Sequence, residues 1–215
     1  MRYTSVLFDL DGTLLDTLGD LTAAMNRTLT RHGLPERTRQ QMRAALGNGA
    51  RRLMELSVPA GTDSALFETL LAEYNADYAA HCRIETAPYP GVAALLLKLH
   101  AQGRKLAIVS NKPDEAVRAL RAEFFADTVP IAVGGKQGIR RKPAPDTLLA
   151  AMEQLGADPA GTVFVGDSEV DIATARAANL PCISVLWGFR DRDVLERAGA
   201  QQFAADIAQL QALLG

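Results

Sequence analysis

Short apolar runs alternate with amphipathic stretches along most of the chain. The runs are rich in β-branched and aromatic residues, which is typical of short buried strands. Helical patterns separate them, among them one that starts at Pro113 and one over Val170–Ala178. This alternation predicts an α/β fold, with a parallel sheet that helices cover on both faces. The predicted strands are Val6–Phe8, Lys105–Val109, Pro130–Val133, Thr162–Val165 and Cys182–Leu186, and two short helices follow the last of them.

The stretch between the first two runs has a different pattern. Apolar residues recur there at helical spacing, and no strand pattern occurs between Thr17 and Cys82. We therefore expect an all-helical domain over residues 17–82, inserted after the first strand, with residues 1–16 and 83–215 forming the core. The residues that carry the spacing are Leu18, Leu21, Met25 and Leu29, and then Leu66, Leu70, Tyr74 and Tyr78.

The composition of the chain limits which binding partners and which cellular compartment we expect. The chain has 215 residues, a formal net charge of -2 and 48% hydrophobic residues, so bulk charge does not indicate binding to nucleic acid or to an anionic membrane. No apolar run approaches the ~20 residues of a membrane helix, and the N-terminus has no signal-peptide pattern. Together with two widely spaced cysteines, this predicts a cytoplasmic protein.

Side chains suited to phosphate chemistry follow the apolar runs. Asp9 and Asp11 come at the end of the first, Ser110 and Asn111 at the end of the next, and Asp167 at the end of a later one. Lys142 in a loop and Asp171 complete the set. Ligands of open α/β sheets bind beyond the carboxyl ends of the strands, where these groups meet. Phosphoryl transfer needs such donors, a cation and an in-line nucleophile, which an aspartate can be.

The acids also indicate a metal ion. Mg²⁺ prefers carboxylate and phosphate oxygens, and no cluster of histidine and cysteine in the sequence suggests a transition metal. Several of these residues have a purely structural alternative, and Lys142, which follows two arginines, could be one more solvated charge. Asp9 and Asp11 could end a strand in an Asp-Gly turn, Ser110 or Asn111 could cap a helix, and Asp171 could belong to a capping box.

Four motifs in order resemble those of the haloacid dehalogenase superfamily, and the resemblance covers the whole chain. Within the helical insert, which is similar to that superfamily's cap domain, Gly47–Ala50 is most similar to the phosphoglycolate phosphatase group. The chain departs from that group at Val170 and at Trp187–Arg190. The four motifs are Asp9–Thr13 with Asp16, Ser110–Pro113, Arg141–Pro145 and Gly166–Asp171.

The resemblance implies a Rossmann-like core and a Mg²⁺-dependent phosphomonoesterase that works through an aspartyl-phosphate. It implies that Asp9 is the nucleophile and that Asp11 is the general acid and base. Ser110 and Lys142 would hold the phosphoryl oxygens. Metal ligands would be Asp9, the Asp11 main-chain carbonyl, Asp167 and Asp171, and the groups assisting substrate binding would be Gly12, Thr13 and Asn111.

The helical insert offers two candidates for substrate specificity. Gly49 allows a tight turn, and the helix that follows presents free N–H groups, which favour anions. Arg51 could contact a second negative group of the substrate, or it could form a solvated basic pair with Arg52.

The expected substrate is a small phosphorylated metabolite, with phosphoglycolate as the leading candidate. Alternatives are a sugar phosphate, a nucleotide or pyrophosphate as substrate, a phosphomutase, or a binding module without activity. We expect a monomer or a weakly associated homodimer.

Overall fold

The computed structural model describes residues 2–215. It divides into two compact units, one comprising the chain up to Leu15 together with Pro88–Gly215, the other comprising Asp16–Ala87. The chain passes from one unit to the other through Leu15–Asp16 (β2) and Ala87–Pro88 (β3), which form a two-stranded sheet.

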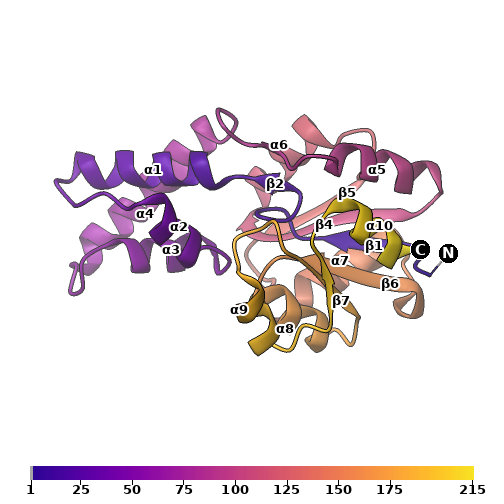
Figure 1. Ribbon diagram of the computed structural model, residues 1–215. Helices are drawn as coiled ribbons and strands as arrows, with labels where there is room; N and C mark the ends of the chain where they lie inside the picture. The colour runs from indigo at the N-terminus through magenta and orange to yellow at the C-terminus, as the bar shows by residue number, and fades with distance from the viewer. Residues whose placement is uncertain (1) are drawn as a thin grey trace. The chain divides into compact units, whose positions relative to one another are not determined.

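The larger unit is built on a six-stranded sheet in the order β5-β4-β1-β6-β7-β8 (Figure 1). Every neighbouring pair is parallel, as the apolar runs predict. The central strand β1 is buried along its whole length, which is why its residues are continuously apolar rather than alternating. The strands are β1 Ser5–Phe8, β4 Lys105–Pro113, β5 Ile131–Gly135, β6 Thr162–Gly166, β7 Cys182–Val185 and β8 Gln202–Ala204.

Helices cover both faces of this sheet, which confirms the predicted α/β class. Figure 1 shows α5, α6 and α10 on one side, and α7 and α8 on the other. Under α7 and α8, the sheet residues Leu7 and Phe164 pack with Leu148 and Ala175 in a fully buried cluster. The helices are α5 Val92–Ala101, α6 Asp114–Phe124, α7 Asp146–Leu155, α8 Glu169–Ala177, α9 Arg192–Arg197 and α10 Ile207–Leu214, with a 3-10 turn at Pro159–Gly161.

Strand register brings the predicted polar groups to one edge. Phe8 of β1 pairs with Ile108 of β4 and with Val165 of β6. The residues that follow these three positions therefore emerge at nearly the same level, at the carboxyl edge where ligands of such sheets bind.

Besides the two-residue strands β2 and β3, which were not predicted, the structure differs from the sequence prediction at β8 and β4. The last two helices are present, but the short strand β8 lies between them. It was not predicted, because three residues are too few to show the period of a strand. Strand β4 also continues to Pro113, with an irregular register after Val109, so Ser110 and Asn111 lie inside it rather than beyond its end.

The smaller unit is all-helical between its two ends. Its interior is formed by apolar residues at the predicted spacing, such as Met25 and Leu29 of α1 and Leu70 and Tyr74 of α4, each at most 2% exposed. The helices are α1 Leu18–Arg31, α2 Arg39–Ala45, α3 Gly49–Ser57 and α4 Ser64–His81.

A buried carboxylate ties the first helix of this unit to the segment after the last. Asp20 is 3% exposed and accepts hydrogen bonds from the main-chain N–H groups of Ile84, Glu85 and Thr86 at 2.9–3.0 Å. The neighbouring Gly19 lies against the Glu85 side chain, since a Cβ there would lie 2.2 Å from the Glu85 carboxylate. Asp20 thus fixes where the chain leaves the helical unit.

A second buried carboxylate joins α1 to α4. Asp77 accepts from Arg27 Nε at 2.9 Å and from Arg31 at 2.6 Å. The hydrogen bonds from Arg27 and Arg31 lower the pKa of Asp77 from its ordinary value, although burial opposes them. The charged form of Asp77 therefore stabilises this helix pair.

We predict that Asp77→Asn lowers the melting temperature, with a loss of about 1–3 kcal/mol of unfolding free energy at neutral pH. The half-exposed arginines favour the lower end of that range. Glu73→Gln, a change on the same helix at a more exposed ion pair with His32, is the matched control and should have little effect. Thermal unfolding followed by circular dichroism measures both.

The same pair predicts a pH dependence. Because the pKa of Asp77 is lower in the folded protein than in the unfolded chain, its contribution is present above the unfolded pKa of about 3.9 and is lost as the pH falls through the folded value. The difference between wild type and Asp77→Asn should therefore shrink between about pH 5 and about pH 3. A constant difference over that range would contradict this account.

Candidate active site

Three aspartates form a buried cluster at the carboxyl edge of the sheet. Asp9 follows β1, Asp167 follows β6, and Asp171 lies in the first turn of α8. One carboxylate oxygen of each lies within 4.8 Å of the others, and the three residues are 7%, 1% and 0% exposed. Carboxylates held this close in a low-dielectric site repel each other strongly.

Lys142 is the cation at the centre of this cluster. Its Nζ lies 2.8 Å from Asp9 Oδ1 and 2.7 Å from Asp171 Oδ1, and its side chain is 2% exposed. Burial alone would lower the pKa of Lys142, but the charges of Asp171 and Asp9 outweigh it and the pKa lies above its ordinary value. Lys142 is therefore positively charged throughout the physiological range.

One lysine does not neutralise three carboxylates. Burial, followed by the charge of Asp171, raises the pKa of Asp9 well above its ordinary value, and Lys142 only partly opposes this. The same causes raise the pKa of Asp167 to about 7. These raised pKa values mean that the acids of the cluster favour protonation over full ionisation, and a bound cation would favour their ionised forms.

Asp171 has a structural task as well as an electrostatic one. Its Oδ2 accepts hydrogen bonds from the Ser168 main-chain N–H at 3.1 Å and from the Ser168 hydroxyl at 2.7 Å. Gly166 makes room for it, since a Cβ there would lie 2.3 Å from Asp171 Cγ. Asp171 therefore caps helix α8 through Oδ2 and contacts Lys142 through Oδ1, so the two roles are compatible.

Asp11 is paired with a different lysine. Lys112 Nζ lies 2.7 Å and 2.8 Å from the two Asp11 carboxylate oxygens. The Lys112 side chain is 4% exposed and that of Asp11 is 19% exposed. Each of the two acids in the first motif thus has its own lysine: Asp9 contacts Lys142, and Asp11 contacts Lys112.

Sequence reasoning assigned no role to Lys112, although the sequence holds a signal for it. Side chains two positions apart in a strand point to the same face, so a strand that continues past Ser110 places Lys112 beside it. We predicted that the strand ends at Val109, and with that boundary Ser110 and Lys112 would not share a face of the strand.

Ser110 and Asn111 contribute hydrogen bonds inside the site and do not cap the following helix. The Ser110 hydroxyl accepts from the Lys112 main-chain N–H at 3.2 Å, and Asn111 Nδ2 donates to the Lys142 carbonyl at 2.9 Å. Helix α6 has no side-chain cap at its N-terminus, so the capping alternative is wrong. Asn111 instead ties β4 to the loop that carries Lys142.

Gly12 and Thr13 line the same edge. Thr13 Oγ1 donates to Asp167 Oδ1 at 3.1 Å. Gly12 has a φ of +85°, and a Cβ there would lie 2.4 Å from Asp167 Oδ2. Only glycine fits this position, because both the backbone conformation and the space exclude a side chain.

The two predicted specificity residues lie in the helical unit. Gly49 is the first residue of α3 and has a φ of +81°. Arg51 makes two hydrogen bonds to the Glu68 carboxylate at 2.8 Å, and Arg52 makes one to Glu55 at 2.9 Å. Each arginine thus has its own acidic partner, and both side chains are about half exposed.

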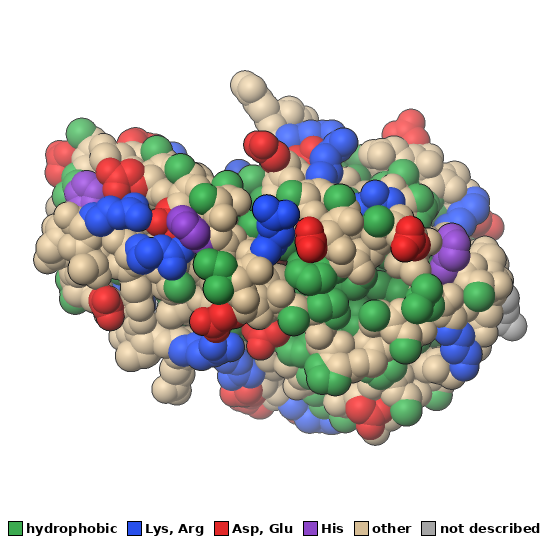
Figure 2. Space-filling view, turned by 90° about the horizontal axis from the view of Figure 1, so that it is seen from above, with side chains coloured by type: hydrophobic (Ala, Val, Ile, Leu, Met, Phe, Trp, Pro, Cys, Tyr) green, Lys and Arg blue, Asp and Glu red, His purple; other side chains and the backbone are tan. Residues whose placement is uncertain are grey.

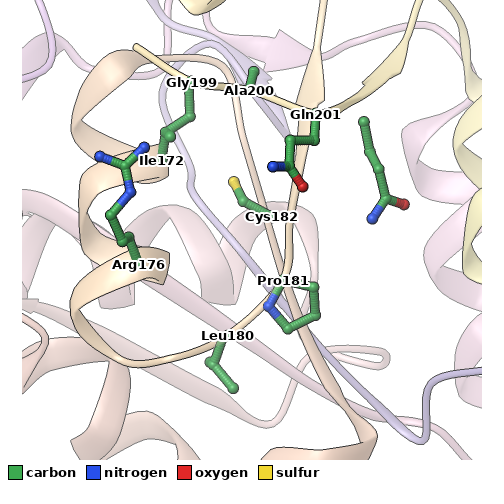
Figure 3. Close-up of a pocket in the computed structure, with 9 residues that line it drawn as sticks. Ile172, Arg176, Leu180, Pro181, Cys182, Gly199, Ala200 and Gln201 are labelled. Atoms are coloured by element: carbon green, nitrogen blue, oxygen red, sulfur yellow. The ribbon is translucent and has the colours of Figure 1, made fainter.

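A further cavity, of about 220 Å³, lies at the opposite edge of the sheet (Figure 3). Its lining includes Arg176 of α8 and the first residues of β7 and β8, Cys182 and Gln202. Burial raises the pKa of the Cys182 thiol, so it is a poor nucleophile. The amino ends of these strands face away from the acidic cluster, and the cavity is separate from it.

The surface agrees with a near-neutral chain. Figure 2 shows basic, acidic and histidine side chains mixed over the visible face of the helical unit. Within residues 2–215, no helix is long and apolar enough to span a membrane.

Comparison with known proteins identifies the family. Residues 6–185 match the model of the haloacid dehalogenase-like hydrolases. A phosphoglycolate phosphatase of Xanthomonas campestris pv. campestris is 36% identical over 192 residues, covering 88% of this chain and 86% of the relative. The N-acetylmuramic acid 6-phosphate phosphatase of Pseudomonas aeruginosa is 34% identical over 190 residues, covering 88% and 84%.

The fold has a close counterpart among solved structures. A crystal structure from Lactobacillus delbrueckii subsp. bulgaricus, of a protein assigned as a phosphoglycolate phosphatase, superimposes with a TM-score of 0.94. It is 35% identical in sequence and covers 100% of this chain and 99% of that one.

The chain belongs to the haloacid dehalogenase-like hydrolase family. Family membership, the similar relatives and the fold together show that the protein is a phosphoric monoester hydrolase similar to the phosphoglycolate phosphatases.

The Lys112–Asp11 contact generates a prediction about activity. Lys112→Met removes the cation that positions the Asp11 carboxylate and should lower kcat by about 10²-fold on an alkyl phosphate, the lower end of what a general acid contributes. Lys98→Met, on the exposed face of α5, is the control. An unchanged kcat in Lys112→Met would argue against a link between Lys112 and Asp11.

Proposed function

We propose that this protein is a Mg²⁺-dependent phosphatase that hydrolyses a small phosphorylated metabolite through an aspartyl-phosphate on Asp9. The observation that carries the proposal is the pairing of two acids, two residues apart, with two separate buried lysines. Lys142 contacts Asp9 within the acidic cluster, and Lys112 contacts Asp11. Asp9 lies in the buried acidic cluster, where a bound cation would favour its ionised form, whereas the Asp11 side chain is paired outside that cluster and is 19% exposed, so the two carboxyl groups have different surroundings.

The acidic cluster fits a divalent cation. Asp9, Asp167 and Asp171 offer carboxylate oxygens within 4.8 Å of one another, and Lys142 offsets only part of their charge. Hard oxygen donors favour Mg²⁺ over softer metals. We propose that these three residues and the Asp11 main-chain carbonyl hold the ion, which supplies positive charge for the phosphoryl oxygens and favours the ionised forms of the acids.

In the first step, an Asp9 carboxylate oxygen attacks phosphorus and the bond to the leaving oxygen breaks. Asp11 donates a proton to that oxygen, so the alcohol departs neutral. Lys142 and Ser110 balance the charge on the phosphoryl oxygens, with help from Gly12, Thr13 and Asn111. The fixed position of Lys142 means that this charge is already oriented before the substrate arrives.

In the second step, water attacks phosphorus and the bond to Asp9 breaks, which regenerates the carboxylate. Asp11, now ionised, accepts the proton of the water. The salt bridge to Lys112 suits this state, because the ammonium group stabilises an ionised Asp11.

We propose that the helical unit acts as a cap over the substrate and that Gly49 and Arg51 contact its non-reacting end. Phosphoglycolate is the leading candidate because several relatives at 34–36% identity are phosphoglycolate phosphatases. A sugar phosphate is the second candidate, since the N-acetylmuramic acid 6-phosphate phosphatase is 34% identical, nearly as similar. Nucleotides, pyrophosphate and a mutase reaction have no comparable support.

The experiment that tests this function measures hydrolysis with and without metal. Removal of metal with a chelator should abolish release of phosphate from phosphoglycolate and from an aryl phosphate. Mg²⁺ should restore it and Ca²⁺ should restore it poorly, because Ca²⁺ prefers a looser, larger coordination shell. Asp167→Asn should need more Mg²⁺ for half-maximal rate, whereas Asp193→Asn, exposed on α9, should not. Full activity of the stripped enzyme in chelator would refute the proposed metal.

The two adjacent arginines of α3 provide a matched test of specificity. Arg51→Ala should raise KM for phosphoglycolate, which carries a second negative group, by about 10-fold, the equivalent of one hydrogen bond to a charged group. KM for an aryl phosphate should change little. Arg52→Ala, which removes an equivalent ion pair with Glu55, is the control, and equal effects of the two changes would argue against a role for Arg51.

A further inference from the structure

The segment after β7 lies directly against the carboxylate of Asp167. This segment is Trp187-Gly188-Phe189, hereafter the 187–189 segment. A Cβ on Gly188 would lie 2.3 Å from Asp167 Cβ and 2.4 Å from the Gly12 carbonyl oxygen. Asp167 is thus enclosed between two glycines, Gly12 and Gly188, each of which allows a main chain to approach it closely.

Two hydrogen bonds fix the orientation of the Asp167 carboxylate. Phe189 N–H donates to Oδ2 at 2.7 Å, and Thr13 Oγ1 donates to Oδ1 at 3.1 Å. Each oxygen therefore accepts from a donor of the chain, and a carboxylate oxygen has further lone-pair capacity for a cation. Because Asp167 is 1% exposed, solvent does not replace either donor.

Trp187 links the same segment to the loop of the first motif. Its Nε1 donates to the Thr13 carbonyl at 3.0 Å, so it holds the residue that donates to the other oxygen of Asp167. The 187–189 segment thus acts on Asp167 twice, directly through the Phe189 main chain and indirectly through Thr13.

We propose that the 187–189 segment is a positioning element of the metal site, which orients Asp167 toward the cation and sets the affinity for it. This inference rests on the proposed function, because it assumes that Asp167 is a metal ligand. Partners that orient a metal ligand typically contribute 10- to 100-fold in affinity. The segment contains no acidic residue, so it acts by hydrogen bonding and by close packing alone.

The test measures binding of Mg²⁺ by isothermal titration calorimetry in the absence of substrate. Gly188→Ala inserts a methyl group against Asp167 and should weaken Mg²⁺ binding by about 10-fold or more. Gly103→Ala is the control for general backbone strain, because the φ of +74° at Gly103 disfavours alanine, whereas a Cβ there meets no atom within 4 Å and the residue precedes β4 at the other edge of the sheet. Circular dichroism without metal verifies that each variant is folded.

A milder variant covers the case in which Gly188→Ala does not fold. Trp187→Phe keeps an aromatic ring and removes only the donor to Thr13, so it should weaken Mg²⁺ binding by roughly 3- to 10-fold. Trp187 is the one tryptophan of the sequence, so its fluorescence in the wild-type protein gives a second, independent titration of the site.

The outcomes separate this inference from the function beneath it. Weaker binding in Gly188→Ala or Trp187→Phe, with wild-type affinity in Gly103→Ala, supports the positioning role. Wild-type affinity in the folded 187–189 variants overturns it and leaves the proposed phosphatase mechanism intact. Absence of Mg²⁺ binding to the wild-type protein overturns the proposed metal site itself.

Discussion

The structure depends on one electrostatic constraint, the confinement of several carboxylates at one edge of a buried sheet. Asp9, Asp167 and Asp171 cannot all be ionised there without cationic partners. Lys142 reaches two of them at hydrogen-bonding distance, and Asp167 is held by neutral donors instead. The carboxylates therefore suit a divalent cation, and the positive charges of that cation and of Lys142 would attract the phosphoryl oxygens.

The backbone around the site follows from that constraint. Carboxylates packed this tightly leave no room for neighbouring side chains, so glycine occurs at Gly12, Gly166 and Gly188, where a Cβ would lie within 2.4 Å of an aspartate atom. The main chain can then approach and donate its N–H groups. The functional edge is therefore built from backbone as much as from side chains.

The sequence was sufficient to predict the sheet, its parallel strands and the all-helical insert, because continuous apolar runs and helical spacing have few other interpretations. The acids and Lys142 could be placed at one edge for the same reason. The pairing of Lys112 with Asp11 could not, since it depends on how far β4 continues past Val109. The hydrogen bond from the Phe189 main-chain N–H to Asp167 could not be predicted either, because every residue except proline has this donor, so the residue type does not indicate which N–H binds a carboxylate.

The central claim, that Asp9 is the nucleophile and Asp11 the acid and base, is tested most directly by trapping the covalent intermediate. Asp11→Asn retains Asp9 but lacks the base for hydrolysis, so with an aryl phosphate and Mg²⁺ it should accumulate one phosphoryl group on Asp9. Acid quenching and mass spectrometry of the N-terminal peptide would locate the group, and Asp9→Asn should acquire none. A phosphoryl group on another residue, or near-normal turnover by Asp9→Asn, would contradict the account.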